Sequence, residues 1–194
     1  MSSADGASLS TRTIRAGIWT VGARLSSRVI DFAVLLVLAR LLGPADFGLV
    51  ATAMTVIYIV EAILELPLTF VLVRMPDVTD RMYNTAFTLG LIRGFLVAGI
   101  MAALSWPLAS LYGDPRLTPL ICVLALAPAA RGMISPRMVI FEKALDFRRK
   151  GILELLGKAV AAAVAITIAV TTGNYWAVAA GTVSTPVVMM IVSY

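Results

Sequence analysis

The sequence has no histidine and a single cysteine, Cys122, among its 194 residues. The lack of histidine excludes a catalytic triad with a histidine base and any metal site with histidine ligands. One cysteine cannot form an internal disulfide, and we interpret Cys122, which lies in an apolar run, as a small packing residue. A glycine-rich phosphate loop is also absent, so the chain is not expected to hydrolyse ATP. We therefore predict neither an enzyme nor a protein that holds a metal or another cofactor.

Charged residues are scarce as well. They make up 14% of the chain, whereas 60% of the residues are apolar and the mean hydropathy is +0.94. A soluble domain is about 45–50% apolar and about 25% charged, and one of this size leaves too much surface exposed to hide such a composition. The sequence therefore predicts an all-α integral membrane protein. We assign its net charge of +5 to membrane orientation rather than to nucleic-acid binding.

Six segments are apolar and long enough to cross a membrane, which takes about 20 helical residues. They are residues 18–42, 47–70, 86–111, 117–141, 152–171 and 175–194. Turn residues separate several of them, namely Gly43-Pro44, Gly113-Asp114-Pro115 and Thr171-Thr172-Gly173-Asn174. Pro128 and Pro136 predict kinks in the fourth segment. Residues 1–13 are expected to form a disordered cytoplasmic tail, and residues 14–194 a single six-span lobe.

Basic residues in the tail and loops lie mostly on one side of these spans. One side holds eight of them, and the other holds only Arg40 and Arg116. The eight are Arg12, Arg15, Arg74, Arg81, Lys143, Arg148, Arg149 and Lys150. Because basic loops stay in the cytoplasm, the sequence predicts a cytoplasmic N-terminus and cytoplasmic loops at residues 71–85 and 142–150. With six spans, both termini would lie on that side.

Ionisable residues also occur inside the predicted spans, where a charge is costly unless it faces the bundle interior or a wet cavity. The basic ones are Arg24, Arg28, Arg93, Arg131 and Lys158, and the acidic ones are Asp31, Glu61, Glu65 and Glu154. Arg24, Arg28 and Asp31 share one helical stripe that lipid would not tolerate, so we expect it to face inward. We predict that the five basic residues form a cationic vestibule that binds a phosphate or pyrophosphate group. The acidic residues would balance these charges or bind a coupling ion.

A plainer interpretation applies to each of these residues taken singly. Arg24, Arg28 and Arg93 lie toward the cytoplasmic ends of their helices and could extend to the lipid headgroups. Glu154 and Lys158 are four residues apart and could neutralise each other within one helix. The vestibule hypothesis depends instead on the whole set, because five spans contribute charge and most of it lies in the cytoplasmic half.

Three further segments combine turn residues with charged or aromatic ones. They are residues 39–48 (ARLLGPADFG), 141–148 (FEKALDFR) and 173–181 (GNYWAVAAG). In this order they resemble the signatures of the polysaccharide flippases, in the O-antigen and exopolysaccharide branch of the multidrug/oligosaccharidyl-lipid/polysaccharide exporter superfamily. The resemblance covers the chain from about residue 13 onward. It implies a translocase for undecaprenyl-diphosphate-linked sugar that works by alternating access without ATP, in which the three segments themselves are structural turns and loop anchors.

The resemblance also implies a fold of two six-helix lobes around a cationic cavity. This sequence would supply one of them, a six-transmembrane-helix lobe of a MATE- or flippase-like transporter, as a truncated product or a fragment. We expect a multi-pass protein of the plasma (inner) membrane whose partners are lipid-linked oligosaccharide, membrane lipids, and a C-terminal lobe or glycan-biosynthesis proteins.

Other functions remain open at this point. A cation-coupled small-molecule exporter of the same superfamily is one, although the excess of arginine inside the spans argues against it. A truncated membrane partner that does not itself transport is another. A membrane glycosyl or acyl transferase is disfavoured, because the sequence has no histidine, no cytosolic catalytic domain and no acidic metal motif in a loop.

Overall fold

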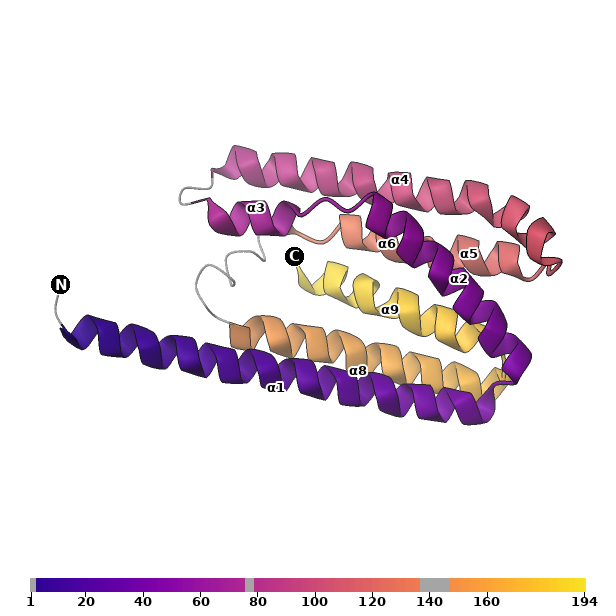
Figure 1. Cartoon of the computed structure of the whole chain (residues 1–194), viewed down its shortest axis with the longest axis horizontal. Helices are drawn as coiled ribbons and strands as arrows, with labels where there is room; N and C mark the ends of the chain where they lie inside the picture. The colour runs from indigo at the N-terminus through magenta and orange to yellow at the C-terminus, as the bar shows by residue number, and fades with distance from the viewer. Residues whose placement is uncertain (1–2, 76–78, 137–146) are drawn as a thin grey trace.

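In a computed structural model, the described part of the chain comprises residues 3–75, 79–136 and 147–194 and contains helices but no strand. The helices are α1 (Ser3–Leu41), α2 (Pro44–Ile63), α3 (Leu68–Arg74), α4 (Asp80–Tyr112), α5 (Leu117–Leu124), α6 (Leu126–Gly132), α8 (Phe147–Thr172) and α9 (Trp176–Val192) (Figure 1). The all-α prediction is confirmed for these residues. Residues 137–146, which include the end of the fourth predicted span and most of the second signature segment, lie outside the described residues.

Among the described residues, three stretches of helix are long and apolar enough to cross a membrane: Pro44–Ile63, Asp80–Tyr112 and Gly151–Thr172. Two shorter apolar stretches, Leu117–Gly132 and Trp176–Val192, accompany them. A helix suits lipid because it pairs its own backbone N–H and C=O groups, for which lipid offers no partners. The protein is therefore a helical membrane protein, and the six-span topology stays a prediction.

Helix α1 covers a segment for which a different structure was expected. It begins at Ser3, so that residues 3–13 continue the helix instead of forming a disordered tail. This segment contains no proline, so no residue in it interrupts the backbone hydrogen bonds of a helix. At the other end, Gly43 and Pro44 separate α1 from α2 as the turn residues predicted.

The second predicted span is not one helix. It ends as α2 at Ile63 and resumes as α3 at Leu68, because Pro67 has no N–H to donate and disfavours a helical residue before it. The fourth predicted span also divides, between α5 and α6 at Ala125. Pro128 follows three residues later and leaves a carbonyl group of the preceding turn without its donor. The helix is therefore interrupted within one turn of Pro128, and the kink there stays a prediction.

Two further connections use glycines in the left-handed backbone region, which other residues avoid. Gly113 has φ of 69° between α4 and α5, and Gly173 has φ of 58° between α8 and α9. The turns that were predicted at both positions are therefore confirmed.

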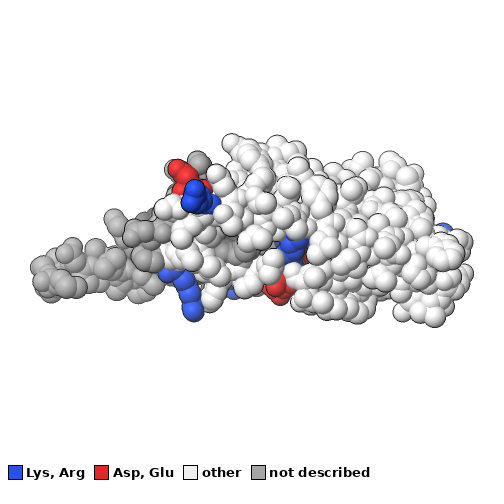
Figure 2. Space-filling model, turned by 90° about the horizontal axis from the view of Figure 1, so that it is seen from above, with Lys and Arg blue, Asp and Glu red and all other residues white. Residues whose placement is uncertain are grey.

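Figure 1 shows the two ends of the helix bundle. The start of α1, the end of α3, the starts of α4 and α8, and the C-terminus lie at one end, here called the N-terminal end. The α1–α2, α4–α5 and α8–α9 connections lie at the other, the turn end. Between them, α1 packs on α8, α8 on α9, α9 on α6 and α6 on α4, while α2 packs on α4 and α5. Seen from above in Figure 2, the face has few charged side chains, and these lie mostly toward the N-terminal end.

The largest buried cluster joins α2, α4, α5 and the start of α9. Its most enclosed members include Ile57 of α2, Met101 of α4 and Leu120 of α5. Val60 extends the cluster to the last turn of α2. The partly buried Leu64, directly after α2, also packs against this cluster. The core therefore lies on both sides of Glu61, the first of the predicted charged residues on that helix.

Candidate functional site

The ionisable residues predicted inside the spans form two groups of contacts in the structure. The first, here called the arginine cluster, comprises Arg93 of α4, Arg131 of α6 and Glu61 of α2. The Arg93 Nε atom donates a hydrogen bond to the backbone oxygen of Leu64 at 2.6 Å, and its Nη2 atom donates to the backbone oxygen of Glu61 at 3.4 Å. The Arg131 Nη1 atom lies 2.8 Å from the Glu61 carboxylate. Three helices therefore meet at one glutamate.

Arg93 stabilises the helix end that the break after α2 creates. The last carbonyl groups of a helix have no donor within the helix and carry the negative end of its dipole. Basic side chains commonly bind such groups. Arg93 pairs two of these carbonyl oxygens, which lipid could not hydrate. An uninterrupted span over residues 47–70, as the sequence predicts, has no helix end at this point, so this role of Arg93 was not predicted.

Glycines at the crossing of α4 and α6 bring the two arginines together. A side-chain carbon built on Gly94 would lie 2.7 Å from the Pro128 carbonyl oxygen, and one built on Gly132 would lie 2.5 Å from that of Gly90. Only glycine leaves room for this approach, and small residues commonly let helix backbones pack closely in membranes. Each arginine of the cluster directly precedes one of these crossing glycines, so the close approach carries both guanidinium groups to the end of α2.

Exposure differs between the members of the cluster. The Arg131 side chain is 45% exposed, whereas that of Glu61 is 16% exposed. Among the described residues, Arg131 uses one of its five N–H groups, in the bond to Glu61. No described residue accepts from its other donors, and a guanidinium group can bind phosphate oxygens through two parallel hydrogen bonds. Arg131 is therefore the member best placed to contact an anionic ligand.

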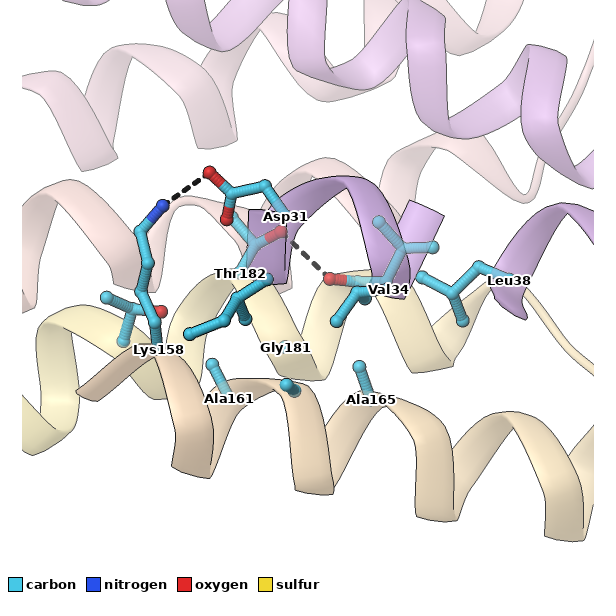
Figure 3. A pocket seen from close by; sticks show the side chains of 12 residues that line it. Asp31, Val34, Leu38, Lys158, Ala161, Ala165, Gly181 and Thr182 are labelled. Carbon is cyan, nitrogen blue, oxygen red and sulfur yellow. Dashed lines mark hydrogen bonds and ion pairs between the residues drawn. The ribbon is translucent and has the colours of Figure 1, made fainter. Parts of the chain in front are cut away.

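The second group lies between α1, α8 and α9, where the structure has a pocket of about 300 Å³ (Figure 3). Lys158 of α8 pairs with Asp31 of α1 at its wall. Aliphatic and small side chains form most of the remaining wall, and the Thr182 hydroxyl donates to the Val178 backbone oxygen of its own helix at 2.8 Å. The Lys158–Asp31 pair adds no net charge to the pocket, in contrast to the two arginines that share one glutamate.

Four predicted residues lie beyond these contacts. Arg24 and Arg28 are exposed on α1, Glu65 is exposed in the link between α2 and α3, and Glu154 is exposed on α8. The two arginines are not enclosed by the described helices, because α1 forms the outermost layer, on α8 (Figure 1). The structure thus gathers the other predicted residues in two groups rather than one, and a common vestibule stays a prediction.

A further ionic site, at the turn end, was missed by the sequence analysis. Arg116, in the α4–α5 connection, contacts Asp114 at 2.9 Å and Asp46 of α2 at 3.3 Å. Its guanidinium carbon lies 5.9 Å from the ring centre of Tyr175, which precedes α9. These four residues are here called the loop clamp. Hydrogen bonds from the Arg116 side chain and backbone lower the pKa of Asp114, and the bond to Asp114 raises the pKa of Arg116.

The loop clamp joins two of the three signature segments. Asp46 belongs to residues 39–48 and Tyr175 to residues 173–181, and both contact Arg116. This agrees with the interpretation of these segments as loop anchors. The available signal was Arg116 itself, one of two basic residues at the turn end and two positions after Asp114. Within the described ranges, no group of three or more cysteine, aspartate or glutamate side chains is placed to hold a metal ion.

Comparison with known proteins adds further findings. A family model described as polysaccharide biosynthesis protein matches residues 37–194. The chain is 24% identical over 164 residues to the succinoglycan biosynthesis transport protein ExoT of Rhizobium meliloti (strain 1021), and the match covers 84% of this chain and 33% of that protein. The chain therefore spans about a third of the length of this curated relative. No solved structure matches the chain at a significant level.

Proposed function

Because this chain belongs to the polysaccharide biosynthesis protein family, we propose that it forms one lobe of a membrane translocase that exports polysaccharide precursors. The cargo in this proposal is a polyprenyl-diphosphate-linked oligosaccharide, which the lobe moves across the membrane by alternating access. The relative named for succinoglycan transport supports the cargo class. Further transmembrane helices would supply the facing wall of the translocation path, since this chain corresponds to about a third of that relative.

The arginine cluster carries the proposal. A diphosphate that leaves water for a cleft in a membrane protein needs cations and hydrogen-bond donors to offset its lost hydration. Arg93 binds backbone oxygens, Arg131 binds the one carboxylate of Glu61, and Arg131 keeps donors that no described residue occupies. We assign the first diphosphate contact to Arg131, with Arg24, Arg28 and Lys158 as further basic residues along the path. Asp31, Glu61, Glu65 and Glu154 would balance these charges in the empty state or bind a coupling ion.

The proposal includes an orientation with the N-terminal end of the bundle in the cytoplasm, where such a cargo is made. Its support is the excess of basic residues in the tail and loops at that end. The test is thiol labelling of Ser3→Cys and Asn174→Cys, each in a Cys122→Ala background because Cys122 is itself exposed. We expect the two positions to react with a membrane-impermeant reagent from opposite sides of the membrane. Labelling of both from the same side would refute this orientation.

Export can be tested in the native host with the gene deleted and variants supplied in its place. We expect Arg24→Ala, Arg28→Ala and Arg131→Ala to abolish surface glycan and to cause lipid-linked oligosaccharide to accumulate, at unchanged protein levels. Lysine in place of each of these arginines should give export between that of the alanine variant and that of the unmodified protein, because lysine lacks the planar fork of donors that binds phosphate. Arg40→Ala, at the turn end of α1, is the matched control and should export normally. Normal export by all three variants would refute the diphosphate path.

A further inference from the structure

The break between α2 and α3 divides one predicted membrane span into two parts that different contacts hold. The main core holds the α2 part through buried residues up to Val60, and the partly buried Leu64 directly after α2 also packs against it. The α3 part is fixed by a separate small cluster, in which Leu72 packs with Ala86 and Tyr83 of α4. Residues 64–67 form the non-helical link between them (Figure 1). A link with rigid parts on both sides is where the direction of the span can change.

Glu61 makes two contacts of different kinds at this end of α2. Its backbone oxygen accepts a hydrogen bond from Arg93, and its carboxylate accepts one from Arg131. The first contact pairs a backbone group and involves no carboxylate. The second ties the last turn of α2 to α6 through an ion pair. An anion that binds Arg131 more strongly than the Glu61 carboxylate does could displace that carboxylate.

Arg131 is accessible to such an anion. Its side chain is 45% exposed, whereas the Glu61 side chain is 16% exposed. A diphosphate carries more negative charge than one carboxylate and offers several oxygens to the guanidinium fork. It therefore competes with Glu61 for Arg131, and the close crossing of α4 and α6 at Gly94 and Gly132 keeps Arg131 in place while the exchange occurs.

We propose that the Glu61–Arg131 pair is a latch on the link at residues 64–67 and that a diphosphate group opens it. The anion takes Arg131, the Glu61 carboxylate is released, and the last turn of α2 loses its tie to α6. Arg93 acts as a positioning residue, because it stays on the backbone oxygens and keeps the freed end from unwinding further. The latch rests on the proposed function, since it adds a conformational response to the same diphosphate site.

Hydrogen exchange of the full chain in lipid nanodiscs tests the latch. The Leu64 N–H donates to the Val60 backbone oxygen at 3.2 Å, so its exchange reports opening of the last turn of α2. We expect Glu61→Gln to raise exchange in the peptide that contains Leu64 by roughly tenfold, the effect of losing one charged hydrogen bond. Inorganic pyrophosphate and geranyl diphosphate are the probes, and binding of each is measured by calorimetry in parallel.

In the unmodified protein, the anion should raise exchange of this peptide to the level of Glu61→Gln. That variant, whose latch is already open, should show no further rise. Arg116→Ala, which removes an arginine at the turn end, is the control and should respond like the unmodified protein. A response to both probes assigns the trigger to the diphosphate group, and a response to geranyl diphosphate alone assigns it to the lipid-linked form, so either supports the latch.

Three results would overturn the proposal, and they differ in whether they also refute the diphosphate site. Binding of a probe without any change in exchange near Leu64 would refute the latch and leave the diphosphate site intact. Absence of binding by both probes would refute the latch and the proposed diphosphate site together. Unchanged exchange in Glu61→Gln without ligand would show that the ion pair does not hold the end of α2, which also refutes the latch.

Discussion

The crossing of α4 and α6 allows a quantitative test with two substitutions in one helix. In Gly94→Ala, the new methyl group would lie 2.7 Å from the Pro128 backbone oxygen and 3.0 Å from the Gly132 Cα atom. Both neighbours belong to the backbone and cannot rotate away, so α4 and α6 must separate. In Gly99→Ala, by contrast, the methyl group meets nothing within 4 Å. The two variants therefore differ in the clash and share the change from glycine to alanine.

The shared change matters for the magnitude. Alanine is favoured over glycine in a helix interior by about 1 kcal/mol, which both variants gain. This gain cancels when the free energies of unfolding of the two variants are compared. The difference between them is then the cost of overpacking at Gly94, which is typically about 1–3 kcal/mol. We expect Gly94→Ala to be less stable than Gly99→Ala by that amount. Separation of the helices also moves Arg131, so Gly94→Ala should weaken its 2.8 Å contact with Glu61.

The assay is unfolding of both variants and the unmodified protein in the same detergent, followed by loss of helical circular dichroism. Gly99→Ala should equal or exceed the unmodified protein in stability, and Gly94→Ala should fall below it. Equal stability of the two alanine variants would refute the close crossing, and with it the explanation of how Arg93 and Arg131 come together.

Three further predictions follow from the other contacts. Asp31→Asn and Lys158→Met should each reduce the yield of folded protein on size-exclusion chromatography, because each leaves one charge unpaired in an apolar bundle, and the double variant should recover it; single variants with normal yield would refute the pairing. Arg116→Ala should raise the pKa of Asp114 toward its ordinary value. Because the folded-state pKa of Asp114 is lowered, the stabilisation by the loop clamp is present above the ordinary aspartate value of about 4 and is lost as pH falls through the folded-state pKa. The midpoint of thermal unfolding should therefore fall more steeply in acid for the unmodified protein than for Arg116→Ala, and parallel curves would contradict this. Gly181→Ala should destabilise the packing of α9 on α8, since its methyl group would lie 2.8 Å from the Ala165 Cβ atom, and an unfolding midpoint equal to that of the unmodified protein would argue against it.

The sequence alone determined the features that depend on local chemistry. An apolar content of 60% is incompatible with a soluble fold of this size, whatever the arrangement of the helices. Gly113 and Gly173 mark turns because their backbone conformations are ones that only glycine adopts readily. Pro128 predicted a kink for an equally local reason, the missing N–H group. Pro67 carried the same signal for the break after α2, which the sequence analysis passed over in favour of a continuous apolar run.

Only the tertiary structure decided which charges meet. The helical period places Arg24, Arg28 and Asp31 on one stripe, but it does not say which helix the stripe faces, and the structure pairs Asp31 with Lys158 more than a hundred residues away. Glu61 and Arg131 likewise meet only in the folded bundle. The crossing of α4 and α6, whose closeness depends on three glycines in two helices, brings Arg131 beside Arg93 at the end of α2. Periodicity fixes the direction of a side chain relative to its own helix. The partner it finds depends on how helices pack on one another, and that is a property of the whole bundle.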